Sequence, residues 1–258
     1  MSLLPPSVLS SIQNTDPQSH LHHIPQELIH DASQPKLPHK SQWLRPSVPM
    51  DWFAPTQIHP FSIAYDEIEG AKIAVALPQS WNGGLLIHCH GHRAVGIGLR
   101  ADLSSDQMPE SYRELLSEGW IVSMTSYRRE GIVLKDAIQD VNNLRKYVED
   151  RFGKISCCIL EGRSMGGAIA TYLSELYGEL YDGAVCIGAA LRVDQKNEPL
   201  PHLNLKFTPK FPILYLTNMS ELGEPSQYIE KSKEKVLEED DIVVPALWTG
   251  KFVNSHDD

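Results

Sequence analysis

The sequence predicts an α/β fold, with a doubly wound, mostly parallel sheet that carries helices on both faces. From residue 61 onward, short apolar runs alternate with amphipathic helical patterns. Strands that alternate with helices imply crossover connections and therefore parallel pairing. A chain of 258 residues with 41% hydrophobic and 22% charged residues is also large enough, and apolar enough, to bury a sizeable core.

The individual elements follow from these patterns. Two strand-like runs, residues 62–68 and 71–77, are joined by Glu69-Gly70, which predicts a hairpin that forms an antiparallel edge of the sheet. Further strands are predicted from apolar runs at residues 85–89, 120–125, 155–160, 183–190, 212–217 and 243–249. Helices are predicted where apolar residues recur every three or four positions, at residues 108–116, 137–148 and 165–177, and in the charged segment 228–239.

The N-terminal part has a different character. Residues 1–57 are rich in Pro, Ser, Gln and His with little periodicity, so we expect an irregular arm before a single α/β domain at residues 58–258. His20, His22 and His23 resemble a metal patch, but no acidic or cysteine partner has suitable spacing. We therefore predict neither a metal site nor a cofactor.

Composition excludes some classes of function. A net charge of −10 disfavours a nucleic-acid binder, which would need a basic face. No apolar stretch reaches the length of a membrane span, and the first residues lack the features of a secretory signal. The cysteines, Cys89, Cys157, Cys158 and Cys186, lie in predicted strands without a disulfide or zinc spacing, which favours a reducing, cytoplasmic location.

The most informative motif is Gly162-Arg-Ser164-Met-Gly166, which lies between a predicted strand and a predicted helix. Glycines at these positions let the strand and the helix approach closely while the serine backbone takes a strained conformation. The start of the helix directs free backbone N–H groups and a positive dipole end toward the serine. A Gly-x-Ser-x-Gly motif in this context is typical of a nucleophile elbow.

A serine that transfers acyl groups also needs oxyanion donors and an acid. His90-Gly91-His92 follows the strand at 85–89, so a turn there can place the backbone N–H of His92 beside that of Met165. For the acid, Glu221 follows the strand at 212–217. Glu224 and Asp194 remain alternatives.

The predicted base is His256, because it is the histidine that follows the last strand in the order serine, acid, histidine. It lies two residues before Asp258, at the end of the chain, where side chains are often frayed. His202, in a proline-rich loop, is the alternative.

Together these motifs resemble those of the α/β-hydrolase superfamily, over roughly residues 60–256. The resemblance rests on His90-Gly91, on the elbow and on the segment from Pro212 through Glu221. It implies an α/β-hydrolase fold in which Ser164 is the nucleophile, Glu221 the acid, and the N–H groups of Met165 and His92 the oxyanion donors.

Two departures from the family pattern stand out. Asn218-Met-Ser-Glu221 replaces the more usual Gly-x-x-Asp, and His256 has no glycine beside it and no helix after it. The second departure suggests a C-terminally truncated member of the superfamily.

The predicted function is that of a serine hydrolase acting on a small carboxylic ester through an acyl-enzyme on Ser164. A serine peptidase or thioesterase stays open, and the alternative class is a non-catalytic binding protein with an incomplete triad. About twenty residues separate Ala190 from Phe211, too few for a large lid, so we expect a fairly open site. Arg128 and Arg129 either meet an anionic substrate group or, as we favour, pair with surface carboxylates such as Glu130 or Asp136.

Overall fold

The computed structural model describes residues 61–104, 108–192 and 204–250. The predicted arm at residues 1–57, with His20, His22 and His23, lies outside the described residues. The strands are β1 (Ser62–Ile68), β2 (Ala71–Leu77), β3 (Gly84–Cys89), β4 (Ile121–Thr125), β5 (Cys157–Arg163), β6 (Gly183–Ile187), β7 (Ile213–Thr217) and β8 (Ala246–Thr249). The helices are α1 (Glu110–Ser117), α2 (Leu134–Phe152), α3 (Met165–Leu176), the short 3-10 helix η4 (Gly178–Leu180) and α4 (Gly223–Lys235).

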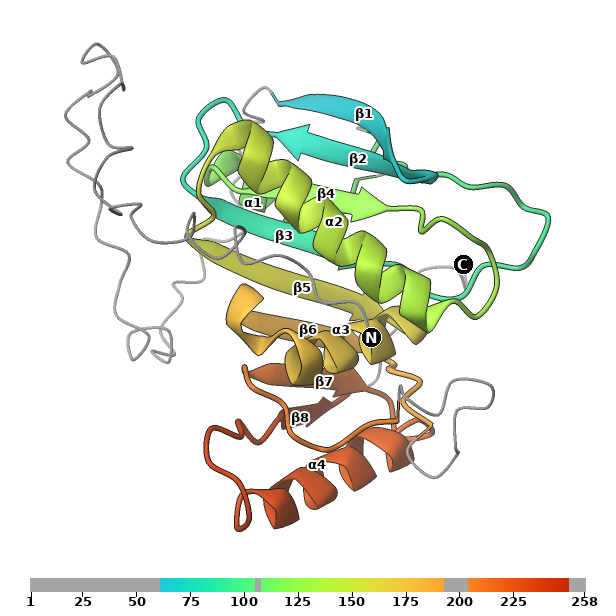
Figure 1. The fold of residues 1–258 in the computed structure, drawn as a ribbon, viewed down its shortest axis with the longest axis vertical. Coiled ribbons are helices and arrows are strands. Elements are labelled where there is room, and N and C mark those ends of the chain that lie inside the picture. Colours follow the sequence, from blue (N-terminus) through green and yellow to red (C-terminus); the bar gives the residue numbers. More distant parts are fainter. Residues whose placement is uncertain (1–60, 105–107, 193–203, 251–258) are drawn as a thin grey trace, which may run out of the picture. The chain divides into compact units, whose positions relative to one another are not determined.

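Within the described residues, the strands form one sheet in the order β1-β2-β4-β3-β5-β6-β7-β8 (Figure 1). Strand β2 runs antiparallel to both β1 and β4, and every later pair is parallel. The predicted mostly parallel sheet with an antiparallel N-terminal edge hairpin is therefore confirmed. Because the strands after β2 share one direction, the segments that follow β3, β5 and β7 leave the sheet at the same edge.

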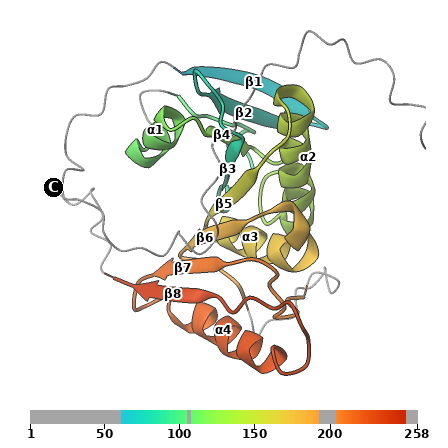
Figure 2. The ribbon, with the colours of Figure 1, turned by 90° about the vertical axis from the view of Figure 1, so that its left-hand side faces the viewer.

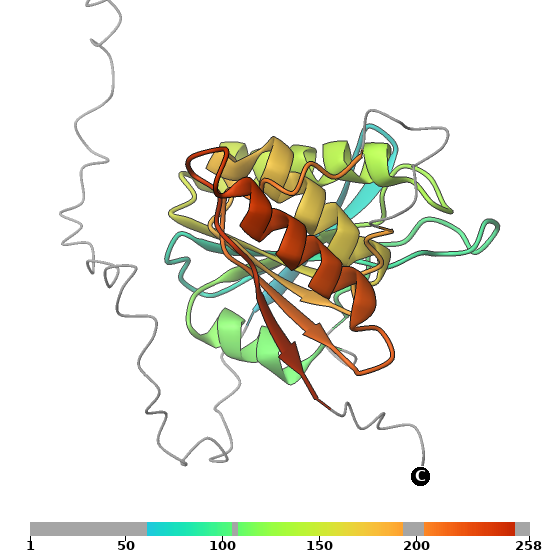
Figure 3. The ribbon, with the colours of Figure 1, turned by 90° about the horizontal axis from the view of Figure 1, so that it is seen from below.

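Helices cover both faces of the sheet. Helix α1 lies on one face, and α2, α3 and α4 lie on the other (Figures 2 and 3). The larger core cluster joins the sheet to α2, α3 and α4, while a smaller cluster lies beneath α1. On α2, the predicted apolar positions Ala137, Val141, Leu144 and Val148 are fully buried, because a spacing of three or four residues places them on one helical face.

The end of the chain differs in part from the prediction. Helix α4 begins at Gly223 rather than at residue 228, and it ends at Lys235 rather than at residue 239. Proline is tolerated in a first helical turn and acidic residues are favoured there, so Glu224 and Pro225 suit the helix start. Strand β5 extends to Arg163, beyond the predicted end at residue 160, because its last residues pair with β6.

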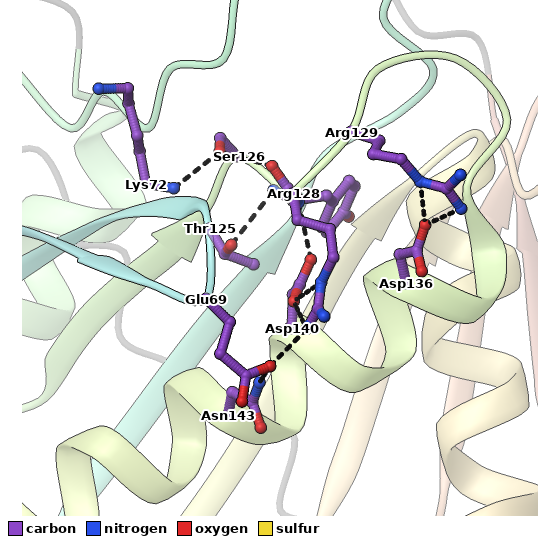
Figure 4. A network of polar contacts seen from close by, with 10 residues as sticks. Glu69, Lys72, Thr125, Ser126, Arg128, Arg129, Asp136, Asp140 and Asn143 are labelled. Carbon is purple, nitrogen blue, oxygen red and sulfur yellow. Dashed lines mark hydrogen bonds and ion pairs between the residues drawn. The ribbon is translucent and has the colours of Figure 1, made fainter.

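A polar network fastens the loop after β4 to α2 (Figure 4). The buried carboxylate of Asp140 accepts hydrogen bonds from the backbone N–H and the guanidinium of Arg128, which also contacts Glu69. Arg129 pairs with Asp136. Both arginines therefore pair with carboxylates, as we favoured from the sequence, although Glu130 instead accepts the backbone N–H groups of Gly96 and Gly98.

No helix of the described part of the chain is long and apolar enough to span a membrane.

Asp136 and Asp140 of α2 are expected to contribute unequally to stability. Asp140 is 2% exposed, and Asp140→Ala leaves the backbone N–H of Arg128 without its acceptor and its guanidinium with Glu69 alone. We expect a loss of about 3 kcal/mol in the free energy of unfolding. Asp136→Ala, the matched control, breaks a pair whose Arg129 side chain is 69% exposed and should cost less than about 1 kcal/mol. Equal losses in urea denaturation would contradict this assignment.

Candidate active site

Ser164 lies between β5 and α3 in a backbone conformation that is rare for a residue with a side chain. Its φ is 51° and its ψ is −116°. Backbone hydrogen bonds hold this conformation. Ser164 N–H donates to Ile187 (3.0 Å), and the Ser164 carbonyl accepts from Gly167 (3.0 Å), Ala168 (3.4 Å) and Ala190 (3.1 Å). Strand β6 and the loop after it therefore support the serine.

The elbow glycines are required by close backbone packing. A Cβ atom on Gly166 would lie 1.9 Å from the carbonyl oxygen of Cys89, at the end of β3. A Cβ atom on Gly162 would lie 2.3 Å from the carbonyl oxygen of Gly166. The start of α3 can therefore contact the end of β3 only with glycine at these positions.

Ser164 opens onto a pocket of about 250 Å³ that brings together three residues predicted separately from the sequence. Ser164, Met165 and His92 all line it, beside a mainly apolar wall. Met165 is the first residue of α3, and its N–H makes no hydrogen bond within the described ranges. A free N–H at a helix start, next to the serine, suits an oxyanion.

His90 anchors the turn that carries His92. Its ring is 6% exposed, stacks on Tyr127 at 4.0 Å, and has ring nitrogens 2.7 Å and 3.1 Å from the carbonyl oxygens of Gly91 and Ser126. The Tyr127 hydroxyl in turn donates to the carbonyl of His90 at 3.0 Å. Burial lowers the pKa of His90 to about 4, so the ring is neutral near pH 7 and holds the turn in place.

Tyr127 is a residue of this site that sequence reasoning missed. It is fully buried and has a φ of 57°. A tyrosine after a strand carries no signal of its own, because its partner His90 is far away in the sequence.

The two glutamates after β7 have different roles. Glu221 lies in the loop between β7 and α4, and its Oε2 accepts a hydrogen bond from Asn218 at 3.2 Å. The same oxygen lies 3.1 Å from the position that a Cβ atom of Gly188 would occupy. Gly188 follows Ile187, whose carbonyl accepts the N–H of Ser164. Glu224 instead lies in the first turn of α4 and accepts the N–H of Leu191 at 2.7 Å. Glu224 thus fastens the loop after β6, and Glu221 remains the predicted acid.

Three of the residues considered for this site, His256, His202 and Asp194, lie outside the described residues. Much of the segment between Ala190 and Phe211, for which we expect no large lid, also lies outside them. In the part of the chain that the structure describes, no three His, Cys, Asp or Glu side chains are grouped to hold a metal.

The chain is similar in fold to several known proteins. The family model described as serine aminopeptidase, S33 matches residues 131–253, less than half of the chain. The acylaminoacyl peptidase of Pyrococcus horikoshii superposes with a TM-score of 0.54 at 12% identity, over 74% of this chain and 37% of that one. The esterase of Pyrobaculum calidifontis gives 0.52 at 15% identity, over 76% and 77%. An esterase/lipase from an uncultured bacterium gives 0.53 at 14% identity, over 73% and 74%.

The chain has the α/β-hydrolase fold. It spans 32% to 37% of the length of the peptidase structures that it resembles. No curated protein matches it in sequence. The family match and the structural neighbours together support a hydrolase of the α/β fold, and both esterases and peptidases occur among the neighbours.

The buried His90 predicts a specific pH dependence of stability. In the unfolded chain this histidine has a pKa near 6.5 and becomes protonated as the pH falls below that value. In the folded protein, His90 stays neutral until the pH approaches about 4. The contribution of His90 is therefore complete above pH 6.5 and is lost as the pH falls toward 4, by ~3 kcal/mol in total. In His90→Gln, the free energy of unfolding should fall less steeply across this range. Identical slopes for the two proteins in urea titrations would show that His90 is not the titrating group.

Proposed function

We propose that this chain is a serine hydrolase that cleaves carboxylic esters through an acyl-enzyme on Ser164. One observation carries the proposal: Ser164 sits in a strained elbow, in the same pocket as His92 and as Met165, whose N–H has no hydrogen-bond partner among the described residues. A strained backbone at a pocket is typical of a functional residue, because surrounding structure must maintain it. The family match and the fold of the neighbours support the same class of reaction.

In the proposed mechanism, the hydroxyl of Ser164 attacks the ester carbonyl while His256, the predicted base, removes its proton. The N–H groups of Met165 and His92 stabilise the negative charge that develops on the carbonyl oxygen. Glu221 orients the base and stabilises its protonated form. The base then protonates the departing alcohol, and water releases the acid from Ser164.

We also propose a cytoplasmic location. All four cysteines are free thiols, three of them buried, as expected for core residues of a protein in a reducing compartment.

The nucleophile can be tested by covalent labelling. A fluorophosphonate probe should label the wild-type chain, and Ser164→Ala should abolish labelling and lower the turnover of 4-nitrophenyl acetate by about 10³-fold or more. Ser174→Ala, a buried serine within α3, is the matched control and should leave labelling intact. Labelling that persists in Ser164→Ala would overturn the proposal, as would no labelling of the folded wild-type chain.

The base is tested separately. His256→Ala should lower 4-nitrophenyl acetate turnover by about 10³-fold, because the hydroxyl of Ser164 is then no longer deprotonated. Turnover that survives in His256→Ala but is lost in His202→Ala would instead assign the base to His202.

A further inference from the structure

A second pocket lies next to the elbow, on the face of the sheet that carries α1. Its volume is about 290 Å³, and its lining mixes apolar residues with polar and charged side chains, among them Arg93, Arg163, His88 and Tyr112. The pocket beside Ser164 has a different set of residues, and its lining is mainly apolar although it includes Arg192.

The chain itself explains why the two pockets adjoin. Arg163 immediately precedes Ser164, and Arg93 immediately follows His92. Each arginine lines the second pocket, while Ser164 and His92 line the first. Residues that are neighbours in the chain thus line different pockets. An ester carbonyl held at Ser164 would therefore have an apolar pocket on one side and a pocket with two arginines on the other.

The buried carboxylate of Glu161 orients the guanidinium of Arg163. The Nε of Arg163 donates to Glu161 at 3.0 Å, and Glu161 is 8% exposed. The other oxygen of Glu161 accepts the hydroxyl of Tyr112 and lies 3.3 Å from Nδ1 of His88. Burial raises the pKa of Glu161, but the contacts with His88 and Arg163 outweigh it and hold the pKa below its usual value. The guanidinium is thus oriented through one nitrogen, and its side chain remains 58% exposed.

Arg93 has no counter-ion among the residues that the structure describes. Its Nη1 donates to the backbone carbonyl of Arg100, a neutral acceptor. Burial, followed by the charge of Arg100, lowers the pKa of Arg93, so its surroundings disfavour the cation. Asp102 also lines the pocket, but its carboxylate accepts the N–H of Ser104 and forms no ion pair with Arg93 in this part of the chain. A partly buried cation without a partner is costly, and an anionic ligand would remove that cost.

We infer that this second pocket binds a carboxylate, and that the substrates are esters that carry a free carboxylate beside the ester group. The planar guanidinium groups of Arg93 and Arg163 match the two oxygens of a carboxylate. The apolar pocket at Ser164 receives the other side of the ester. This inference rests on the proposed function for its substrate class.

The test compares matched pairs of substrates. Mono(4-nitrophenyl) glutarate is paired with 4-nitrophenyl 5-methylhexanoate, and 4-acetoxybenzoate with 4-isopropylphenyl acetate, so each neutral partner replaces the carboxylate with an isopropyl group. The wild-type chain should prefer the anionic member of at least one pair by roughly 10- to 100-fold in kcat/KM. Arg93→Met and Arg163→Met should each reduce that ratio to near one.

The control is Arg151→Met, which removes a surface arginine at the C-terminal end of α2. This variant should keep the wild-type ratio, because that end of α2 lies at the edge of the sheet opposite the elbow (Figure 1). The inference is overturned if neither pair shows a preference, or if the preference survives in both Arg93→Met and Arg163→Met.

Failure of the proposed function is distinguishable from failure of this inference. If a fluorophosphonate labels Ser164 but no preference for anionic esters exists, the proposed serine hydrolase function is supported and the proposed carboxylate site is overturned. If neither labelling nor turnover occurs, calorimetry with free glutarate tests the pocket directly. Binding that is lost in Arg93→Met but kept in Arg151→Met would support the site, and absence of binding would overturn it.

Discussion

The close contact between the start of α3 and the end of β3 is the constraint on which the candidate site depends. Gly166 packs against the carbonyl of Cys89 at a distance that no side chain permits. This contact brings Met165 and Ser164 beside the turn that carries His92. So sharp a turn requires a positive φ at Ser164, which is an energetically unfavourable conformation. Hydrogen bonds to Ile187 and Ala190 stabilise it.

A second layer of buried groups supports that turn from behind. The ring of His90 lies on Tyr127, whose hydroxyl binds the carbonyl of His90. The following residue, Arg128, is fastened to Asp140 on α2. The position of the His92 turn is thus tied to a helix in the core as well as to contacts within the loop. Such support is expected where backbone donors must be held in place for chemistry.

Much of the architecture was predictable because it depends on local patterns. Apolar runs located the strands of the sheet, and the Gly-x-Ser-x-Gly motif located Ser164. The different contacts of Glu221 and Glu224 were not predictable. The two residues lie three positions apart with the same chemistry, and the start of α4 at Gly223 separates them. The helix places Glu224 against the N–H of Leu191 and leaves Glu221 in the loop near Gly188.

By itself, the sequence determined the fold class, the order of most strands and helices, and the position of the elbow, because burial periodicity and glycine requirements act over a few neighbouring residues. Only the tertiary structure decided which side each arginine faces. Arg128 and Arg129 are paired with Asp140 and Asp136, and only the fold identifies Asp140 as the partner of Arg128. Arg93, which carried no signal, has no carboxylate partner among the described residues. Whether a charge is neutralised depends on residues far away in the sequence, and folding alone brings them together.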